Sequence, residues 1–244
     1  MEAATVDKIV ALQKQIPEVV TAAGQTFLTH DLHRVMEFDP RPEAFKLSTL
    51  TGLRDYLKAN VENVALDKVI VHVNDYTSVT VETAYEGETK KRTYVLGVKL
   101  DQNLKTFQFG QWMSTDDFIL AARTLFHGNG AMDELVKYAS LVSVEDGTTL
   151  EDNGVSTTMR IKKSVTSGVT NEVTSTGFYT LIPFRTFREI EQIESLFLFR
   201  MKIVEGKGAQ VALFEADGGS WRLEAVNRIK AWITREVPTV TVIA

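Results

Sequence analysis

The stretch from Ile193 to Phe214, IESLFLFRMKIVEGKGAQVALF, decides the fold. In its first half, two sets of side chains alternate along the chain. One set is Phe197, Phe199, Met201 and Ile203, and the other is Leu196, Leu198, Arg200 and Lys202. This period of two is typical of a pleated strand. Gly206 and Gly208 favour the positive φ values of a tight connection, so we expect a long β-hairpin. The register stays open, because the second strand offers two alternating pairs to the first face, Val211 with Leu213 or Ala212 with Phe214.

The composition predicts a soluble intracellular protein with a large core. The chain has 244 residues, 44% of them apolar, and a chain of this size buries about 70% of its unfolded surface. It contains no cysteine, which excludes disulfides, thiolate metal sites and cysteine nucleophiles and is compatible with a reducing cytoplasm. The net charge of -5 is spread along the chain, so we expect no broad attraction to DNA or to an anionic membrane. No run of about 18 apolar residues occurs, and residues 1–15 lack the features of a signal peptide.

The N-terminal part is predicted to be a helix followed by an extended arm. Apolar residues recur at helical spacing from Ala3 to Ala23, and Pro17 interrupts them, which predicts a short helix, a kink and one or two further turns. Pro40 and Pro42 favour extended backbone before them, so the connection from Gly24 to Phe45 is predicted to be irregular. Such an arm either wraps around its own domain or reaches a neighbouring subunit.

A helix and a β-meander are predicted next. The helix runs to Asn60, with Ser48 or Thr51 as the candidate N-cap and an apolar face that includes Leu53 and Leu57. Three strands with alternating residue types follow, separated by turn sequences: Asp67 to Val73, Ser78 to Tyr85 and Lys91 to Val98. We expect one face of this meander to be exposed to solvent.

Two helices are predicted after the meander. The residues from Ser114 to Asp117 have the sequence of a helix start, and the apolar stripe that follows ends at Leu125. A glycine in the segment from His127 to Gly130 is expected to supply the left-handed C-cap. A short helix from Met132 to Ser140 follows.

The C-terminal part is predicted to be rich in strands. Four strands separated by turn sequences precede the hairpin: Val142 to Val144, Val155 to Val165, Val169 to Thr174 and Phe178 to Ile182. After the hairpin, the residues from Asp217 to Ser220 are predicted to cap a last helix from Trp221 to Arg235. The tail from Thr239 to Ile243 is of β type and is suited to add to a sheet edge.

These elements predict an α+β fold. An antiparallel β-meander and long β-hairpins are expected to pack with several amphipathic helices, and an extended N-terminal arm precedes them. The first helix and the arm occupy residues 1–45. Residues 46–140 hold the meander with its helices, and residues 141–244 hold the strand-rich part with the last helix and the tail. The last two parts form one domain or two closely packed lobes.

The residue types that carry chemistry form no recognisable constellation. His30, Asp31 and His33 cluster in the arm, and the two histidines could share a metal on a helix, but no third ligand follows at a helical spacing. A solvated polar arm is therefore favoured. The run Gly218-Gly219-Ser220 is interpreted as a helix N-cap, and Gly128-Asn129-Gly130 lacks the lysine of a phosphate loop.

The remaining histidines and the acidic pairs are explained by local structure. His72 falls in a strand and His127 at a helix end. The acidic pairs fall at a helix start and at two turns, where the helix dipole and solvation account for them: Asp116-Asp117, Glu145-Asp146 and Glu151-Asp152. We therefore expect a protein that is not an enzyme and that holds no cofactor and no metal.

Two basic clusters are the candidate contacts to nucleic acid. One is Lys90, Lys91 and Arg92, and the other is Arg160 with Lys162, which share a face if they lie on a strand. Lysines on edge strands also prevent sheets from aggregating, and this second interpretation is favoured over nucleic-acid binding.

The order of segments resembles the YfdQ-like family of phage and prophage proteins. The resemblance covers residues 45–235 and rests on three stretches: TLTGLRDYL from Thr49 to Leu57, FQFGQWMSTDDFILAARTLF from Phe107 to Phe126, and the strand-rich end with FYTLIPFR and LFLFRMKI. This family has no assigned function, so the resemblance transfers no functional residues. It implies a virus-encoded protein made in the cytoplasm of a bacterial host.

Taken together, these features predict a non-enzymatic phage protein that assembles into a homo-oligomer, either a ring or a shell-like particle. The arm and the exposed strand edges are the parts expected to make the contacts, because an unpaired strand edge must be covered. The alternative is a phage accessory protein that binds nucleic acid or a host defence factor. In both cases no membrane is expected as a partner.

Overall fold

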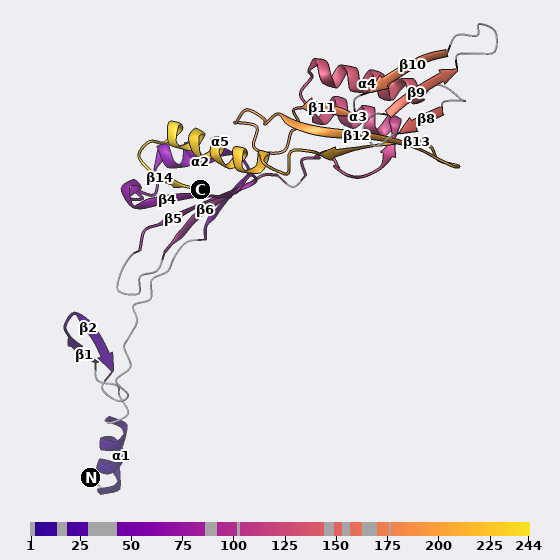
Figure 1. Ribbon diagram of the computed structural model, residues 1–244. Coiled ribbons are helices and arrows are strands. Elements are labelled where there is room, and N and C mark those ends of the chain that lie inside the picture. Colours follow the sequence, from indigo (N-terminus) through magenta and orange to yellow (C-terminus); the bar gives the residue numbers. More distant parts are fainter. Residues whose placement is uncertain are drawn as a thin grey trace. The chain divides into compact units, whose positions relative to one another are not determined.

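The protein has an α+β fold (Figure 1). The computed structural model describes residues 3–13, 19–28, 43–85, 92–101, 103–143, 149–152, 157–162, 170–175 and 177–244. The chain divides into two compact units, Met1–Pro42 and Glu43–Ala244.

The N-terminal unit combines one helix with one small hairpin. Helix α1 spans Ala3–Gln13, and the antiparallel strands β1, Val19–Ala22, and β2, Gln25–Leu28, follow it. The helical turns predicted up to Ala23 are therefore wrong, and so is the irregular backbone predicted for the residues that form β2. Residues 29–42 of the predicted arm lie outside the described residues. Ala23 and Gly24 both have positive φ, 51° and 74°, and such a pair makes the tight turn that joins two strands.

The second unit contains a five-stranded sheet in the order β14-β4-β5-β6-β3. Its strands are Phe45–Leu47 (β3), Val69–Asp75 (β4), Ser78–Thr83 (β5), Tyr94–Lys99 (β6) and Thr241–Ile243 (β14). Strands β4, β5 and β6 form the predicted antiparallel meander, and β3 and β14 join it in parallel as the two edge strands. The tail therefore adds to a sheet edge, as predicted.

Two helices cover one face of this sheet. These are α2, Leu50–Ala59, and α5, Trp221–Glu236, and a short 3-10 helix, Leu66–Lys68, leads into β4. Leu53 of α2 and Ile229 of α5 are fully buried in one apolar cluster with Val71 of β4. His72, the next residue on β4, is exposed on the opposite face, so the predicted solvent-exposed face is confirmed.

Thr49 caps the N-terminus of α2. Its hydroxyl accepts a hydrogen bond from the Gly52 N–H at 3.1 Å. Neither Ser48 nor Thr51 caps this helix as predicted, because Thr49 takes the extended backbone directly before the first helical residue. Asn60 ends the helix in the left-handed conformation with φ of 40°, at the position that the sequence indicated.

The hairpin that decides the fold lies in a four-stranded sheet, in the order β11-β12-β13-β7. Its strands are Met113–Ser114 (β7), Phe178–Leu181 (β11), Ser195–Val204 (β12) and Gly208–Glu215 (β13). Gly206 and Gly208 both have φ of 72°, as the predicted tight connection requires. Phe199 lies opposite Leu213, so the pair Val211 with Leu213 shares the face of the first aromatic set.

Two further helices pack on this sheet. They are α3, Thr115–Leu125, and α4, Gly130–Ser143. Phe118 of α3 and Leu135 of α4 are buried in a second apolar cluster with Phe199 of β12. The hydroxyl of Ser114 accepts a hydrogen bond from the Asp117 N–H at 3.1 Å, so the predicted start of α3 is confirmed.

The connection between α3 and α4 differs from the prediction. Gly128 and Gly130 have no positive φ, so no glycine makes a left-handed cap. Phe126 is extended instead, and the Asn129 side chain accepts a hydrogen bond from the Met132 N–H at 2.8 Å at the start of α4. Helix α4 continues to Ser143, so the strand predicted at 142–144 is wrong for its described residues.

A three-stranded sheet in the order β10-β9-β8 completes the described strands. Its strands are Thr149–Asp152 (β8), Thr157–Lys162 (β9) and Thr170–Ser175 (β10). Strand β9 lies within a predicted strand, and β10 matches the other except that it ends one residue later, at Ser175. Strand β8 was not predicted, and the assignment of Glu151-Asp152 to a turn is wrong, because both residues lie in β8. Strand β9 is the central one.

Candidate functional site

The first predicted basic cluster is described only at Arg92, because Lys90 and Lys91 lie outside the described residues. The Arg92 guanidinium lies over the Tyr85 ring, 4.4 Å from its centroid. It also donates a hydrogen bond to the Thr83 carbonyl oxygen at 3.4 Å. These contacts hold the Arg92 side chain against its own sheet.

The second basic cluster lies on the central strand of the three-stranded sheet. Arg160 and Lys162 are two residues apart on β9, with Arg160 opposite Glu172 of β10 and Thr149 of β8. The interpretation of these residues as protection for an edge strand is wrong, because β9 has a partner on each side.

The histidines that the structure describes have separate surroundings. His127 packs against Phe184, with 4.4 Å between the ring centroids, and His72 is exposed on β4. The cluster of His30, Asp31 and His33 lies outside the described residues.

The acidic pairs and the glycine-rich run also have local roles. Asp117 accepts a hydrogen bond from the Ser114 hydroxyl at 2.7 Å, and Glu145-Asp146 lies outside the described residues. Ser220 precedes α5, but its side chain makes no capping hydrogen bond; Asp217 accepts one from the Gly219 N–H at 3.0 Å instead. In the described parts of the chain, no group of three His, Asp or Glu side chains could hold a metal ion.

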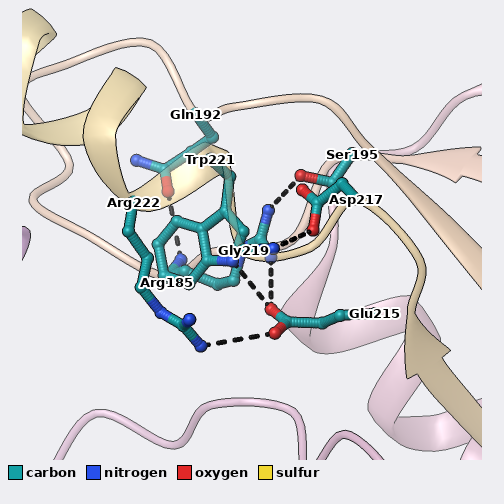
Figure 2. A network of polar contacts seen from close by, with 8 residues as sticks. All are labelled: Arg185, Gln192, Ser195, Glu215, Asp217, Gly219, Trp221 and Arg222. Atoms are coloured by element: carbon teal, nitrogen blue, oxygen red, sulfur yellow. Dashed lines mark hydrogen bonds and ion pairs between the residues drawn. The ribbon is translucent and has the colours of Figure 1, made fainter.

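A buried arginine that the sequence did not single out organises a polar network (Figure 2). Arg185, after β11, pairs its guanidinium with the Glu215 carboxylate at the end of β13, at 2.8 Å. It donates a second hydrogen bond to the Ser195 hydroxyl at 2.5 Å, and its backbone N–H donates to the Gln192 side-chain oxygen at 3.1 Å. The guanidinium also lies over the Trp221 ring, 3.8 Å from its centroid.

The charge of Arg185 is compensated inside the protein. Burial lowers the pKa of Arg185 to about 10, and the charge of Glu215 and the hydrogen bond to it partly oppose this shift. Glu215 in turn accepts a hydrogen bond from the Trp221 indole at 2.8 Å and pairs with Arg222 at 3.4 Å. At neutral pH Arg185 is therefore a paired cation.

The Arg185 network joins the four-stranded sheet to the five-stranded sheet of the second unit. Its guanidinium lies 5.5 Å from the ring centroid of Phe197, in the apolar cluster of the four-stranded sheet. Trp221, on its other side, packs edge-on against Tyr76 at 4.7 Å, in the turn that joins β4 to β5. The donors and acceptors point at one another, as they do in a structural junction (Figure 2).

An open groove of about 490 Å³ runs beside this junction, between the start of β12 and the first turns of α5. Leu196 and Leu223 are its exposed apolar side chains. Acidic residues line it as well, and Glu224 pairs with Arg228 at 2.7 Å.

No family model, no curated protein and no solved structure matches this chain. Among the described residues, no helix has the length and apolar character to cross a bilayer.

Proposed function

We propose that this is a non-enzymatic protein that assembles into a homo-oligomer, a ring or a shell-like particle, through its N-terminal unit. The observation that carries the proposal is the apolar stripe of α1. Val6 is 45% exposed and Val10 is 44% exposed, one helical turn apart on the same side of the helix.

The described elements of the N-terminal unit have little to stabilise them alone. Helix α1 has 11 residues, and isolated helices shorter than about 12–15 residues are marginal in water. The β1–β2 hairpin has two four-residue strands, and an isolated two-stranded hairpin is also marginal. Packing the stripe on a neighbouring copy would stabilise both, and repetition of the same contact by symmetry produces a closed assembly.

The viral setting is part of the proposal. It is supported by the resemblance of residues 45–235 to phage and prophage proteins, which also supports the cytoplasm of a bacterial host as the place where the protein acts.

The native mass in solution tests the assembly. Light scattering behind size exclusion should give a discrete oligomer for the full chain and a smaller species for Val6→Asp with Val10→Asp. Lys8→Asp is the matched control, because it changes the net charge by the same amount from the opposite side of α1 and should leave the mass unchanged.

A monomeric full chain would contradict the proposal. An unchanged mass for the double variant would contradict the proposed role of α1 in assembly. In the first case the alternative, an accessory protein that binds nucleic acid or a host defence factor, would become the better account.

A further inference from the structure

The exposed face of the five-stranded sheet carries a hollow between β3, β5 and β6. Its volume is about 290 Å³. Its surface is mainly apolar, and its rim is polar and basic. Its lining includes Lys46, Tyr94, Gly97 and Lys99. The helices that cover the sheet lie on the other face, with Val79 and Val98 buried beneath them.

Gly97 creates the floor of this hollow. Its φ is not positive, so the backbone does not require glycine at this position in the middle of β6. A Cβ atom there would overlap the hydroxyl oxygen of Tyr94. The absence of a side chain at Gly97 therefore lets the Tyr94 ring lie across its own strand. Tyr94 remains 47% exposed, and its ring offers an aromatic surface at the edge of the hollow.

Two lysines flank the same glycine. Lys46 of β3 lies directly beside Gly97 in the parallel register, and Lys99 lies two residues further along β6 on the same face. Within the described residues neither ammonium group makes an ion pair. Glu82, opposite Tyr94 on β5, does not line the hollow. The rim is therefore positively charged in a protein whose net charge is -5.

We propose that this hollow binds a nucleoside phosphate, with the base against the Tyr94 ring and the phosphate between Lys46 and Lys99. Bases stack on exposed aromatic rings, and lysine ammonium groups bind phosphate as point charges. A volume of about 290 Å³ is at the lower end of ligand pockets, which suits one nucleotide unit. That unit is either a free nucleotide or one member of a single strand, and the negative net charge of the protein opposes broader binding to nucleic acid.

Two probes test the site and distinguish a free nucleotide from one nucleotide of a single strand as its ligand. The first is thymidine monophosphate, measured by calorimetry, and the second is a fluorescein-labelled strand of about ten thymidines, measured by anisotropy at about 50 mM salt. Tight binding of the monophosphate indicates a free nucleotide. Binding of the strand alone, weakening as salt rises, indicates a site for single-stranded nucleic acid.

Matched variants decide whether the hollow is responsible. Lys46→Gln with Lys99→Gln should weaken binding about tenfold or more, whereas Lys105→Gln with Lys207→Gln, exposed elsewhere, should not. Tyr94→Ala should weaken binding about fivefold or more, and Tyr94→Phe, which keeps the aromatic face, should change it little. Circular dichroism confirms that each variant is folded.

Absence of binding for both probes would overturn the proposal, and so would equal affinity in the Lys46/Lys99 variant and in its control. The proposal does not depend on assembly: the variant with Val6→Asp and Val10→Asp should bind nucleotide as the wild type does, because it leaves the hollow intact.

Discussion

Arg185 carries a charge that folding takes out of water, and Glu215 is the acidic partner that compensates it. Removing one partner of a buried ion pair costs about 3–5 kcal/mol, and Glu215 is 22% exposed, so Glu215→Gln should lower the free energy of unfolding by about 3 kcal/mol. Adding Arg185→Met should restore part of this loss, because it removes the unpaired charge. Urea denaturation of the two single variants and the double variant measures the coupling, and additive losses would contradict it.

Tyr56 should make the stability of the folded protein decrease at alkaline pH. Burial, followed by a hydrogen bond at 2.9 Å to Glu62 and by the charge of that residue, raises the pKa of Tyr56 from 10.0 to about 12. The folded state therefore holds its proton more tightly, and the stability that this contributes is present below pH 10 and is lost as the pH rises to about 12.

In urea denaturation at a series of alkaline pH values, Tyr56→Phe should show a shallower loss of stability than the wild type. The absorbance of tyrosinate, compared between folded wild type and folded Tyr56→Phe, gives an independent check, since the difference between them should be one group that titrates at about pH 12. Identical alkaline slopes for both proteins would show that Tyr56 does not cause the dependence.

Helices α2 and α5 start differently, and this difference predicts different costs for removing a hydroxyl. Thr49 accepts a capping hydrogen bond and Ser220 makes none. Thr49→Ala should therefore lower the free energy of unfolding by about 1 kcal/mol, whereas Ser220→Ala should change it by less than about 0.5 kcal/mol. Equal losses in denaturant titrations would mean that the Thr49 hydrogen bond contributes nothing.

Elements with local signals could be predicted from the sequence. The β12–β13 hairpin and the meander have period-two patterns and turn residues, and the start of α3 has a capping serine. The end of α4 was missed because a short run of apolar and β-branched residues at 141–144 fits a strand as well as a helix. In the structure the helix continues to Ser143. Strand β1 was missed because the helical spacing was extended through Pro17, and β2 because the segment that contains it was interpreted as an irregular arm.

The polar junction and the hollow could not be found in this way. Arg185 meets Glu215 and Trp221, which are distant in sequence and lie on different elements, and no local pattern marks such a meeting. The hollow depends on β3 lying beside β6 in parallel, which places Lys46 next to Gly97. A propensity for strand does not specify that neighbour.

The whole chain should behave as two units with separate stabilities. All three buried apolar clusters of the described residues belong to the unit Glu43–Ala244. A protein consisting of residues 43–244 should therefore unfold within about 4 °C of the full chain at low concentration, since that shift corresponds to about 1 kcal/mol or less. Scanning calorimetry measures it, and a much lower midpoint would show that the N-terminal unit stabilises the rest.

Because β14 pairs with β4, the five-stranded sheet cannot be completed while its last strand is still inside the ribosome. Strands β4, β5 and β6 emerge early in synthesis with α2, but α5, which supplies Ile229 and Ile233 to the same core, emerges much later. The helices and strands of the other core are translated in between. For much of translation, the nascent chain therefore exposes the inner valines of its meander, a segment that a ribosome-associated chaperone would bind.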